Sequence, residues 1–293
     1  MLMRPIPADA PTVPLQQSDA WATALAATGR RVTRRNLDGF GHLLVADVPL
    51  WRLGRISVGS RGPVWASDAM PTDRSTALQR SGPRVLNVED PDPVVLSAAG
   101  YRQILTPASI AELPLWPDDS LQIAQCNGKW RNALFQARRK GIDPRSVPAD
   151  RDLLDWLLHR DAGQQRQKGY RGLPALFVRS LVAAAPHESR IWIAGPRVAP
   201  LAAMLILRHG LSATYLLGWS GRAGRAASAH HAILMAAATR LGVQGCRSLD
   251  LGLIDTVNAP GLARFKIGSG ARVGTLGGTW LRLPGLAQRD LAC

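Results

Sequence analysis

The segment from Leu249 to Gly268 constrains the fold more than any other part of this 293-residue chain. It opens with a short apolar run, which is typical of a buried strand, and this run ends at polar residues. Asn258 and Pro260 then supply a cap and a first-turn residue for a helix, near whose end lie Phe265 and Lys266. The spacing predicts a strand, a loop and a helix that hold a lysine beside the strand end. A cation in that position can stabilise negative charge that appears only in a transition state.

Strand and helix patterns alternate along the rest of the chain, which predicts an α/β protein. We expect strands at residues 31–36, 42–48, 55–58, 85–88, 102–105, 190–194, 201–208, 213–219, 247–251 and 279–283. We expect helices at residues 18–28, 72–80, 128–140, 150–163, 174–185, 228–241 and 260–267. A turn is expected at residues 59–63 and a linker at residues 142–149. The predicted organisation is a flexible tail (1–14), a first domain (15–147) and a second domain (148–293).

The chain is strongly basic, with 36 Lys and Arg side chains against 21 Asp and Glu, and nearly all of its cations are arginine. Arginine matches phosphate through paired hydrogen bonds, so this excess favours a polyanionic partner. Charge alone does not separate tRNA from coenzyme A or a nucleotide-linked sugar. The three cysteines, Cys126, Cys246 and Cys293, have neither metal-ligand nor disulfide spacing. No apolar run is long enough for a membrane span, and the lack of a disulfide framework favours a reducing compartment, so we expect a cytoplasmic protein.

Four segments carry a resemblance to a known family. They are Gln17-Ser18-Asp19-Ala20-Trp21, Arg61-Gly62-Pro63-Val64, Lys129-Trp130-Arg131 with Arg138-Arg139-Lys140-Gly141, and Asp250 to Gly268. In this order the sequence resembles the FemAB/FemX-like acyltransferases of the GNAT superfamily. The resemblance implies two fused GNAT-like domains, each with a mixed sheet flanked by helices. It also implies acyl transfer to an amine, with aminoacyl-tRNA or acyl-coenzyme A as a co-substrate rather than a tightly bound cofactor.

Two positions depart from the family pattern. Ala24 stands where members that modify muramyl peptides have a lysine, which removes the expected contact with an acceptor phosphate. The segment Gly221–Ala227 occupies the place of the pyrophosphate loop of GNAT enzymes, but its glycines are out of register. This departure weakens coenzyme A as the donor and leaves aminoacyl-tRNA as the first choice.

The predicted catalytic residues are Lys266, Phe265 and Asp250. Lys266 would stabilise the oxyanion formed when an amine attacks an ester or thioester, although a lysine at a helix end also ordinarily solvates the last carbonyls. Phe265 would shape the acyl pocket or belong to the core. Asp250 would accept the proton of the amine or serve only to end its strand. No metal ligation is expected, because the adjacent His230 and His231 have no further ligand at a suitable spacing.

Further residues are predicted to bind the two substrates. By the resemblance and their positions, the candidates for the acceptor are Arg61, Arg166, Tyr170, Tyr215 and Asp255. The candidates for donor phosphates or tRNA are Arg222, Arg225 and Arg264, the first two because Gly221–Arg225 precedes a helix whose free N–H groups favour anions.

The favoured prediction is therefore an aminoacyl-tRNA-dependent transferase that forms an amide on a small or peptidic amine. An acyl-coenzyme A N-acyltransferase on the same fold is one alternative. A non-catalytic binder of RNA or of another acidic partner on a GNAT scaffold is another. The acceptor, the transferred group and the oligomeric state are left open.

Overall fold

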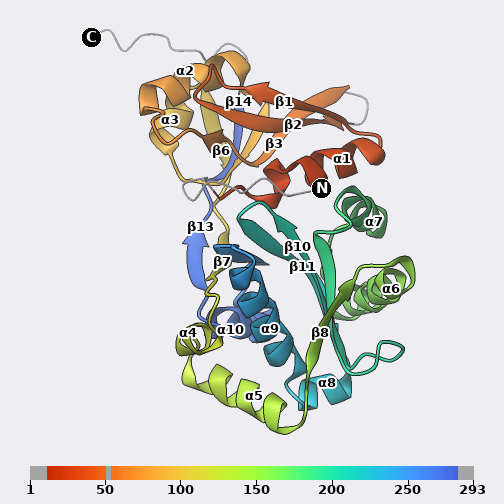
Figure 1. Ribbon diagram of the computed structural model, residues 1–293. Coiled ribbons are helices and arrows are strands. Elements are labelled where there is room, and N and C mark those ends of the chain that lie inside the picture. The colour runs from red at the N-terminus through yellow and green to blue at the C-terminus, as the bar shows by residue number, and fades with distance from the viewer. Residues whose placement is uncertain (1–11, 51–53, 283–293) are drawn as a thin grey trace. The chain divides into compact units, whose positions relative to one another are not determined.

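The computed structural model describes residues 12–50 and 54–282 (Figure 1). The predicted N-terminal tail therefore lies, up to residue 11, outside the described residues. The chain divides into two compact units: residues 110–274 form most of one, here called the C-terminal unit. The described residues of 13–109 together with 275–282 form the other, the N-terminal unit. The expected boundary at 147/148 lies inside the C-terminal unit.

The N-terminal unit is built on a mixed seven-stranded sheet in the described chain, with strand order β1-β2-β3-β5-β14-β6 and β4 paired to β2. Its core is apolar and lies between this sheet and its helices. The strands are β1 (Arg31–Asn36), β2 (Gly41–Pro49), β3 (Arg55–Gly62), β4 (Val64–Trp65), β5 (Val85–Val88), β6 (Tyr101–Leu105) and β14 (Gly278–Arg282). The helices are η1 (Leu15–Gln17), α1 (Asp19–Ala27), α2 (Pro71–Ser81) and α3 (Pro93–Ala98).

The C-terminal unit holds a second mixed seven-stranded sheet, again counted over the described residues, in the order β13-β7-β12-β11-β10-β9-β8. Its strands are β7 (Ser109–Pro114), β8 (Pro144–Pro148), β9 (Ser189–Ala194), β10 (Ala202–His209), β11 (Ser212–Ser220), β12 (Ser248–Leu253) and β13 (Arg272–Thr275). Its helices are α4 (Asp119–Ala124), α5 (Gly128–Arg139), α6 (Arg151–Lys168), α7 (Ala175–Ala184), α8 (Arg222–Ala226), α9 (Ala229–Val243) and α10 (Pro260–Gly268).

Both faces of the second sheet are buried. On β10, Met204 and Ile206 pack with α5 and α9, whereas Ala203 and Leu205 pack with α6 and α7. Successive side chains of a strand point to opposite faces, so a strand covered on both sides is apolar throughout. Figure 1 shows α6 and α7 on the side of this sheet opposite α9. Among the helices of the described chain, none combines the length and apolar character that a bilayer crossing requires.

Most predicted elements are present, and Ser18 caps α1 as expected by accepting the N–H of Trp21 at 3.2 Å. Two predictions are wrong. The expected turn at 59–63 is strand as far as Gly62, because β3 continues alongside β5. The expected linker at 142–149 contains β8, which pairs with β9 through Val147↔Ile191. Prolines at both ends of β8 suggested a linker, but an edge strand tolerates proline because one side of its backbone needs no partner.

The two sheets also exchange strands along the chain. The last described strand, β14, was expected to close the second domain, but it pairs with β5 and β6 of the N-terminal unit. Conversely, β7 follows the first-half strands in sequence and pairs with β12 of the C-terminal unit. Alternating apolar and polar residues specify a strand and its buried face, whereas long-range packing decides which neighbouring strand it pairs with.

Candidate active site

The end of β12 and the last turn of α10 meet at Lys266. Its Nζ donates a hydrogen bond of 2.8 Å to the carbonyl oxygen of Leu253, the last residue of β12. Only 5% of Lys266 is exposed. Gly252 precedes the accepting residue with φ of +78°, a left-handed conformation that favours glycine. The lysine thus lies in the interior beside a strand end.

Burial lowers the pKa of the Lys266 ammonium from its usual 10.5 to about 8, and the Asp250 carboxylate opposes that shift. The group is therefore mostly protonated at pH 7. Its hydrogen bond to Leu253 uses one of its three N–H groups. Asp250 itself accepts the backbone N–H of Gly252 at 2.7 Å, so it fixes the strand end as well. The arrangement combines a buried cation with a nearby carboxylate.

An aromatic cluster surrounds the residue before the lysine. The Phe265 ring lies 5.1 Å from the ring of His231, 6.1 Å from Trp130 and 6.2 Å from His230. The Trp130 indole Nε1 donates to the carbonyl oxygen of Phe265 at 3.0 Å, which ties α10 to α5. His230 Nε2 donates to the carbonyl oxygen of Trp219 at 3.0 Å. Burial lowers the pKa of His230 to about 4, so this imidazole is neutral at pH 7.

The loop between β12 and α10 corrects one prediction. The N-cap of α10 is Ala259, with Pro260 in the first turn, and Asn258 does not cap the helix. Instead Asn258 donates to the Asp255 carboxylate from its backbone N at 2.7 Å and from Nδ2 at 2.8 Å. An Asx-type turn competes with a helix cap for the same polar side chains. The Asn258 hydrogen bonds lower the pKa of Asp255, whose exposed carboxylate is thus engaged within its own loop.

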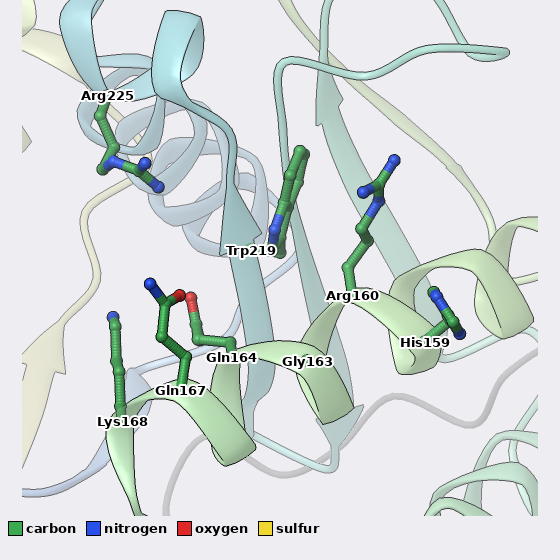
Figure 2. A pocket seen from close by; sticks show the side chains of 8 residues that line it. All are labelled: His159, Arg160, Gly163, Gln164, Gln167, Lys168, Trp219 and Arg225. Atoms are coloured by element: carbon green, nitrogen blue, oxygen red, sulfur yellow. The ribbon is translucent and has the colours of Figure 1, made fainter.

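A cavity of about 630 Å³ lies beside the end of β11 (Figure 2). Residues from α6, β11 and α8 line it: His159, Arg160, Gly163, Gln164, Gln167, Lys168, Trp219 and Arg225. Three of these side chains are cationic and none is a carboxylate. The Arg160 guanidinium lies over the Trp219 ring, 5.1 Å from its centroid. Arg225, predicted to bind donor phosphates, donates from Nη1 to the carbonyl oxygen of Ser220.

Two of the predicted acceptor residues lie next to this cavity around a buried carboxylate. The Tyr170 hydroxyl donates to Asp161 at 3.0 Å and accepts from Gln164, a cavity residue, at 2.9 Å. Tyr215 is close enough to Asp161 and Tyr170 for their charges to act on it, and burial raises its pKa. A Cβ added at Gly218 would meet the Tyr215 hydroxyl, which places this hydroxyl against β11.

The structure does not bring the remaining predicted residues to these two places. Arg166, Arg222 and Arg264 are exposed, and none of them lines the cavity. Arg61 belongs to the N-terminal unit, where its guanidinium binds Glu89 through bonds of 2.5 and 2.6 Å. Across residues 12–50 and 54–282, no group of three His, Cys, Asp or Glu side chains is arranged to hold a metal ion.

Sequence reasoning missed most of the cavity because it ended the helix at residue 163, whereas α6 continues to Lys168. Over its full length, Arg160, Gln164, Gln167 and Lys168 recur at intervals of three and four residues. Side chains at this spacing share one face of a helix. The polar stripe was therefore readable from the sequence, but its pairing with Trp219 required the packing of α6 on β11.

No protein-family model and no curated protein sequence matches this chain. Solved structures do. The structure of FemX matches with a TM-score of 0.74 and 14% identity, covering 93% of this chain and 92% of FemX. L-PGS from Bacillus licheniformis matches with a TM-score of 0.54 and 14% identity, covering 89% of this chain and 85% of that one. The chain has the fold of FemX. This likeness confirms the predicted FemX-like architecture, with two mixed sheets flanked by helices.

Within the FemX-like fold, the Lys266 site and the cavity lie at the ends of two neighbouring parallel strands. β11 and β12 pair from Ser212↔Ser248 to Thr214↔Asp250 and are joined through α8 and α9. Beyond these three residue pairs the strands, both described in full, do not pair with each other. Lys266 is bound at the end of β12, and Trp219 lies near the end of β11. The fold thus puts the buried cation and the cationic cavity on adjacent, diverging strands.

Proposed function

We propose that this protein is an acyltransferase that forms an amide on an amine acceptor, with aminoacyl-tRNA as the donor. The observation that carries the proposal is the buried Lys266 ammonium, anchored to the Leu253 carbonyl beside Asp250. Burying a lysine costs folding free energy, and ionisable groups with shifted pKa values concentrate at functional sites. Solved structures of similar fold include FemX and the C-terminal domain of a putative lysylphosphatidylglycerol synthetase, which supports a transferase of this kind.

The proposed reaction is direct attack without a covalent enzyme intermediate. The nitrogen of the acceptor forms a bond to the ester carbonyl carbon of the donor, and the carbonyl oxygen becomes an oxyanion. Lys266 donates to that oxyanion with the N–H groups that Leu253 does not use. The bond from carbon to the ribose oxygen then breaks. The nitrogen loses its proton to the departing oxygen, either directly or by way of Asp250, so that the ribose oxygen leaves as a hydroxyl.

The donor's phosphates find a suitable environment in the cavity beside β11. Arg160, Lys168 and Arg225 line it without an opposing carboxylate. Charge-assisted hydrogen bonds from such side chains to phosphate are roughly twice as strong as neutral ones. The same cations suit the phosphates of acyl-coenzyme A, which makes this thioester the second candidate donor. The proposed domain division and the roles of the exposed arginines stay predictions.

The donor is tested by incubating the protein with a charged tRNA pool or with an acyl-coenzyme A pool, each beside a metabolite extract that supplies amines. Amide products are detected by mass spectrometry, with and without RNase. We expect product formation that needs charged tRNA and is abolished by RNase. A Lys266→Met variant should lose about a hundred- to thousand-fold in rate, the usual cost of one oxyanion donor. Lys129→Met, which removes an exposed lysine on α5, is the matched control and should keep its rate.

Other outcomes assign other functions. Product formed from acyl-coenzyme A in the presence of RNase would replace the tRNA donor by the thioester. Salt-sensitive tRNA binding without turnover of any donor would show a non-catalytic RNA-binding protein, because phosphate contacts weaken as salt rises. Full turnover by Lys266→Met would refute the proposed mechanism even if the reaction itself were correct.

A further inference from the structure

We infer that a second cavity of the C-terminal unit, beside α9, binds a short apolar peptide of three or four residues through its free amino and carboxyl ends. The cavity has a volume of about 500 Å³, within the 300–1,000 Å³ that is typical of small-molecule sites. It is lined by α4, α5, the residues that lead into β8, and α9. The class of ligand follows from the apolar floor of the cavity, from its charges and from the distance between them.

The floor of the cavity is one side of α9. This side contributes Ala232, Ala236, Arg240 and Val243, at intervals of four, four and three residues. Side chains at this spacing share one face of a helix. Ile142, which precedes β8, adds a further apolar side chain to the lining. The two alanines are small, so they leave room for the side chains of a ligand, whose burial against an apolar surface is favourable.

Two of the four charged side chains that line the cavity already neutralise each other. Arg138 donates to the Asp119 carboxylate at 2.9 and 3.1 Å, and Thr239 donates to the same carboxylate at 3.4 Å. The side chains of Asp143 and Arg240 are exposed and make no hydrogen bond or ion pair within residues 12–50 and 54–282. One carboxylate and one guanidinium in the same cavity select a molecule that carries both an ammonium group and a carboxylate.

The strand register puts these two charges at opposite ends of the cavity. The pairings of β8 with β9, β9 with β10 and β10 with β11 align Pro144 with Ser220, at the end of β11. The chain runs from there through α8 into α9, so Asp143 lies at the end where α9 begins, as Figure 1 shows for the start of β8. Arg240 lies eight residues after Ala232, a rise of about 12 Å along the helix.

This separation sets the length of the ligand. A free amino acid carries its ammonium group and its carboxylate on one carbon atom, so it is too short to reach from one end of the cavity to the other. An extended peptide spans about 3.3–3.6 Å per residue, so three or four residues cover about 12 Å. A polyanion would be repelled by Asp143, and an apolar ligand without charged ends would leave both Asp143 and Arg240 unmatched.

The inference is tested by isothermal titration calorimetry of the full chain with the tripeptide leucyl-alanyl-leucine. Its amino-acetylated form, its carboxy-amidated form and free leucine serve as comparisons. We expect the free tripeptide to bind most tightly. Each capped form should bind about tenfold more weakly, because capping removes one charged hydrogen bond. Leucine should bind more weakly than either capped form.

Variants of the two charged residues test the orientation of the peptide. Asp143→Asn and Arg240→Gln should each weaken binding of the free tripeptide about tenfold. In Asp143→Asn acetylation of the peptide should have no further effect, and in Arg240→Gln amidation should have none, because each pair of changes removes the same contact. Asp152→Asn and Arg139→Gln are the matched controls. They remove exposed charges outside the cavity, on α6 and α5, and should bind the tripeptide as the unmodified chain does.

Several outcomes would overturn the inference. Undetectable binding of the tripeptide would remove the site, and equal weakening by the control variants would show attraction to bulk charge. Equal affinity for leucine would refute the length of the ligand. Unchanged affinity of the acetylated peptide would refute the role of Asp143 and assign the cavity to the carboxyl end of a partner protein. Asp143 and Arg240 are exposed, so their variants should fold, and the measurements involve neither Lys266 nor a donor, which leaves the proposed function to its own test.

Discussion

Replacing Lys266 by methionine should lower the transfer rate about a hundred- to thousand-fold without destabilising the fold. In the folded chain the pKa of Lys266 is about 8 against an ordinary 10.5. At 1.36 kcal/mol for each pKa unit, keeping the ammonium buried at pH 7 costs about 3 kcal/mol of folding free energy. The variant recovers that cost, but it leaves the Leu253 carbonyl without its donor, a loss of about 1–3 kcal/mol. Because a methionine fills similar space, the free energy of unfolding should rise by roughly 0–2 kcal/mol.

The pH dependence of the unfolding free energy isolates the contribution of the buried Lys266 charge. Between pH 8 and 10.5 the unfolded chain keeps the Lys266 proton that the folded chain has released, so stability rises with pH in this range. The unmodified chain should therefore gain stability relative to Lys266→Met, by at most about 1.4 kcal/mol per pH unit and about 3 kcal/mol in total. Below about pH 7 the difference should be constant, because both states then hold the proton.

The assay is urea unfolding followed by circular dichroism at half-unit steps from pH 6 to 10.5, for the unmodified chain, Lys266→Met and Lys129→Met. Lys129 is exposed, so its variant should show no such slope. Transfer activity measured on the same samples should fall above about pH 8 in the unmodified chain, since the neutral amine is a much weaker donor to an oxyanion than the charged ammonium. Loss of more than 2 kcal/mol in Lys266→Met at pH 7, or a stability difference independent of pH, would refute the reasoning and mark Lys266 as a structural residue.

Three further predictions follow from named contacts. Trp130→Phe removes the indole donor to the Phe265 carbonyl and should lower the free energy of unfolding by about 1 kcal/mol. It should also lower kcat with little change in KM. An unchanged kcat would show that this hydrogen bond does not position α10. Tyr170→Phe takes a donor from the buried Asp161 and should cost about 1–3 kcal/mol in thermal or urea unfolding; no loss would mean that the carboxylate is otherwise satisfied. Gly242→Ala should destabilise the fold by more than 1 kcal/mol, because the added Cβ would lie 2.4 Å from the backbone oxygen of Trp116, in the segment after β7. An unchanged melting temperature in calorimetry would contradict that contact.

The local sequence predicts much of the fold, because the signals are local. The strand from 31 to 36 matches β1, and the capping serine before α1 does what its side chain predicts. The strand, loop and helix around Lys266 also form as expected, although Asn258 binds Asp255 in the loop rather than capping the helix. Here two local motifs compete for the same polar side chain, and propensity alone does not rank them.

By itself the sequence determined the alternation of strands and helices, the FemX-like pattern of motifs and the place of one lysine near a strand end. Only the tertiary structure decided that β7 and β14 pair with strands of the other half of the sequence, that Lys266 is buried, and that α6 meets Trp219 in a cavity. The reason is physical. Backbone preference and apolar periodicity act over a few residues, whereas strand pairing, desolvation and the joining of side chains from distant segments depend on how the whole chain packs.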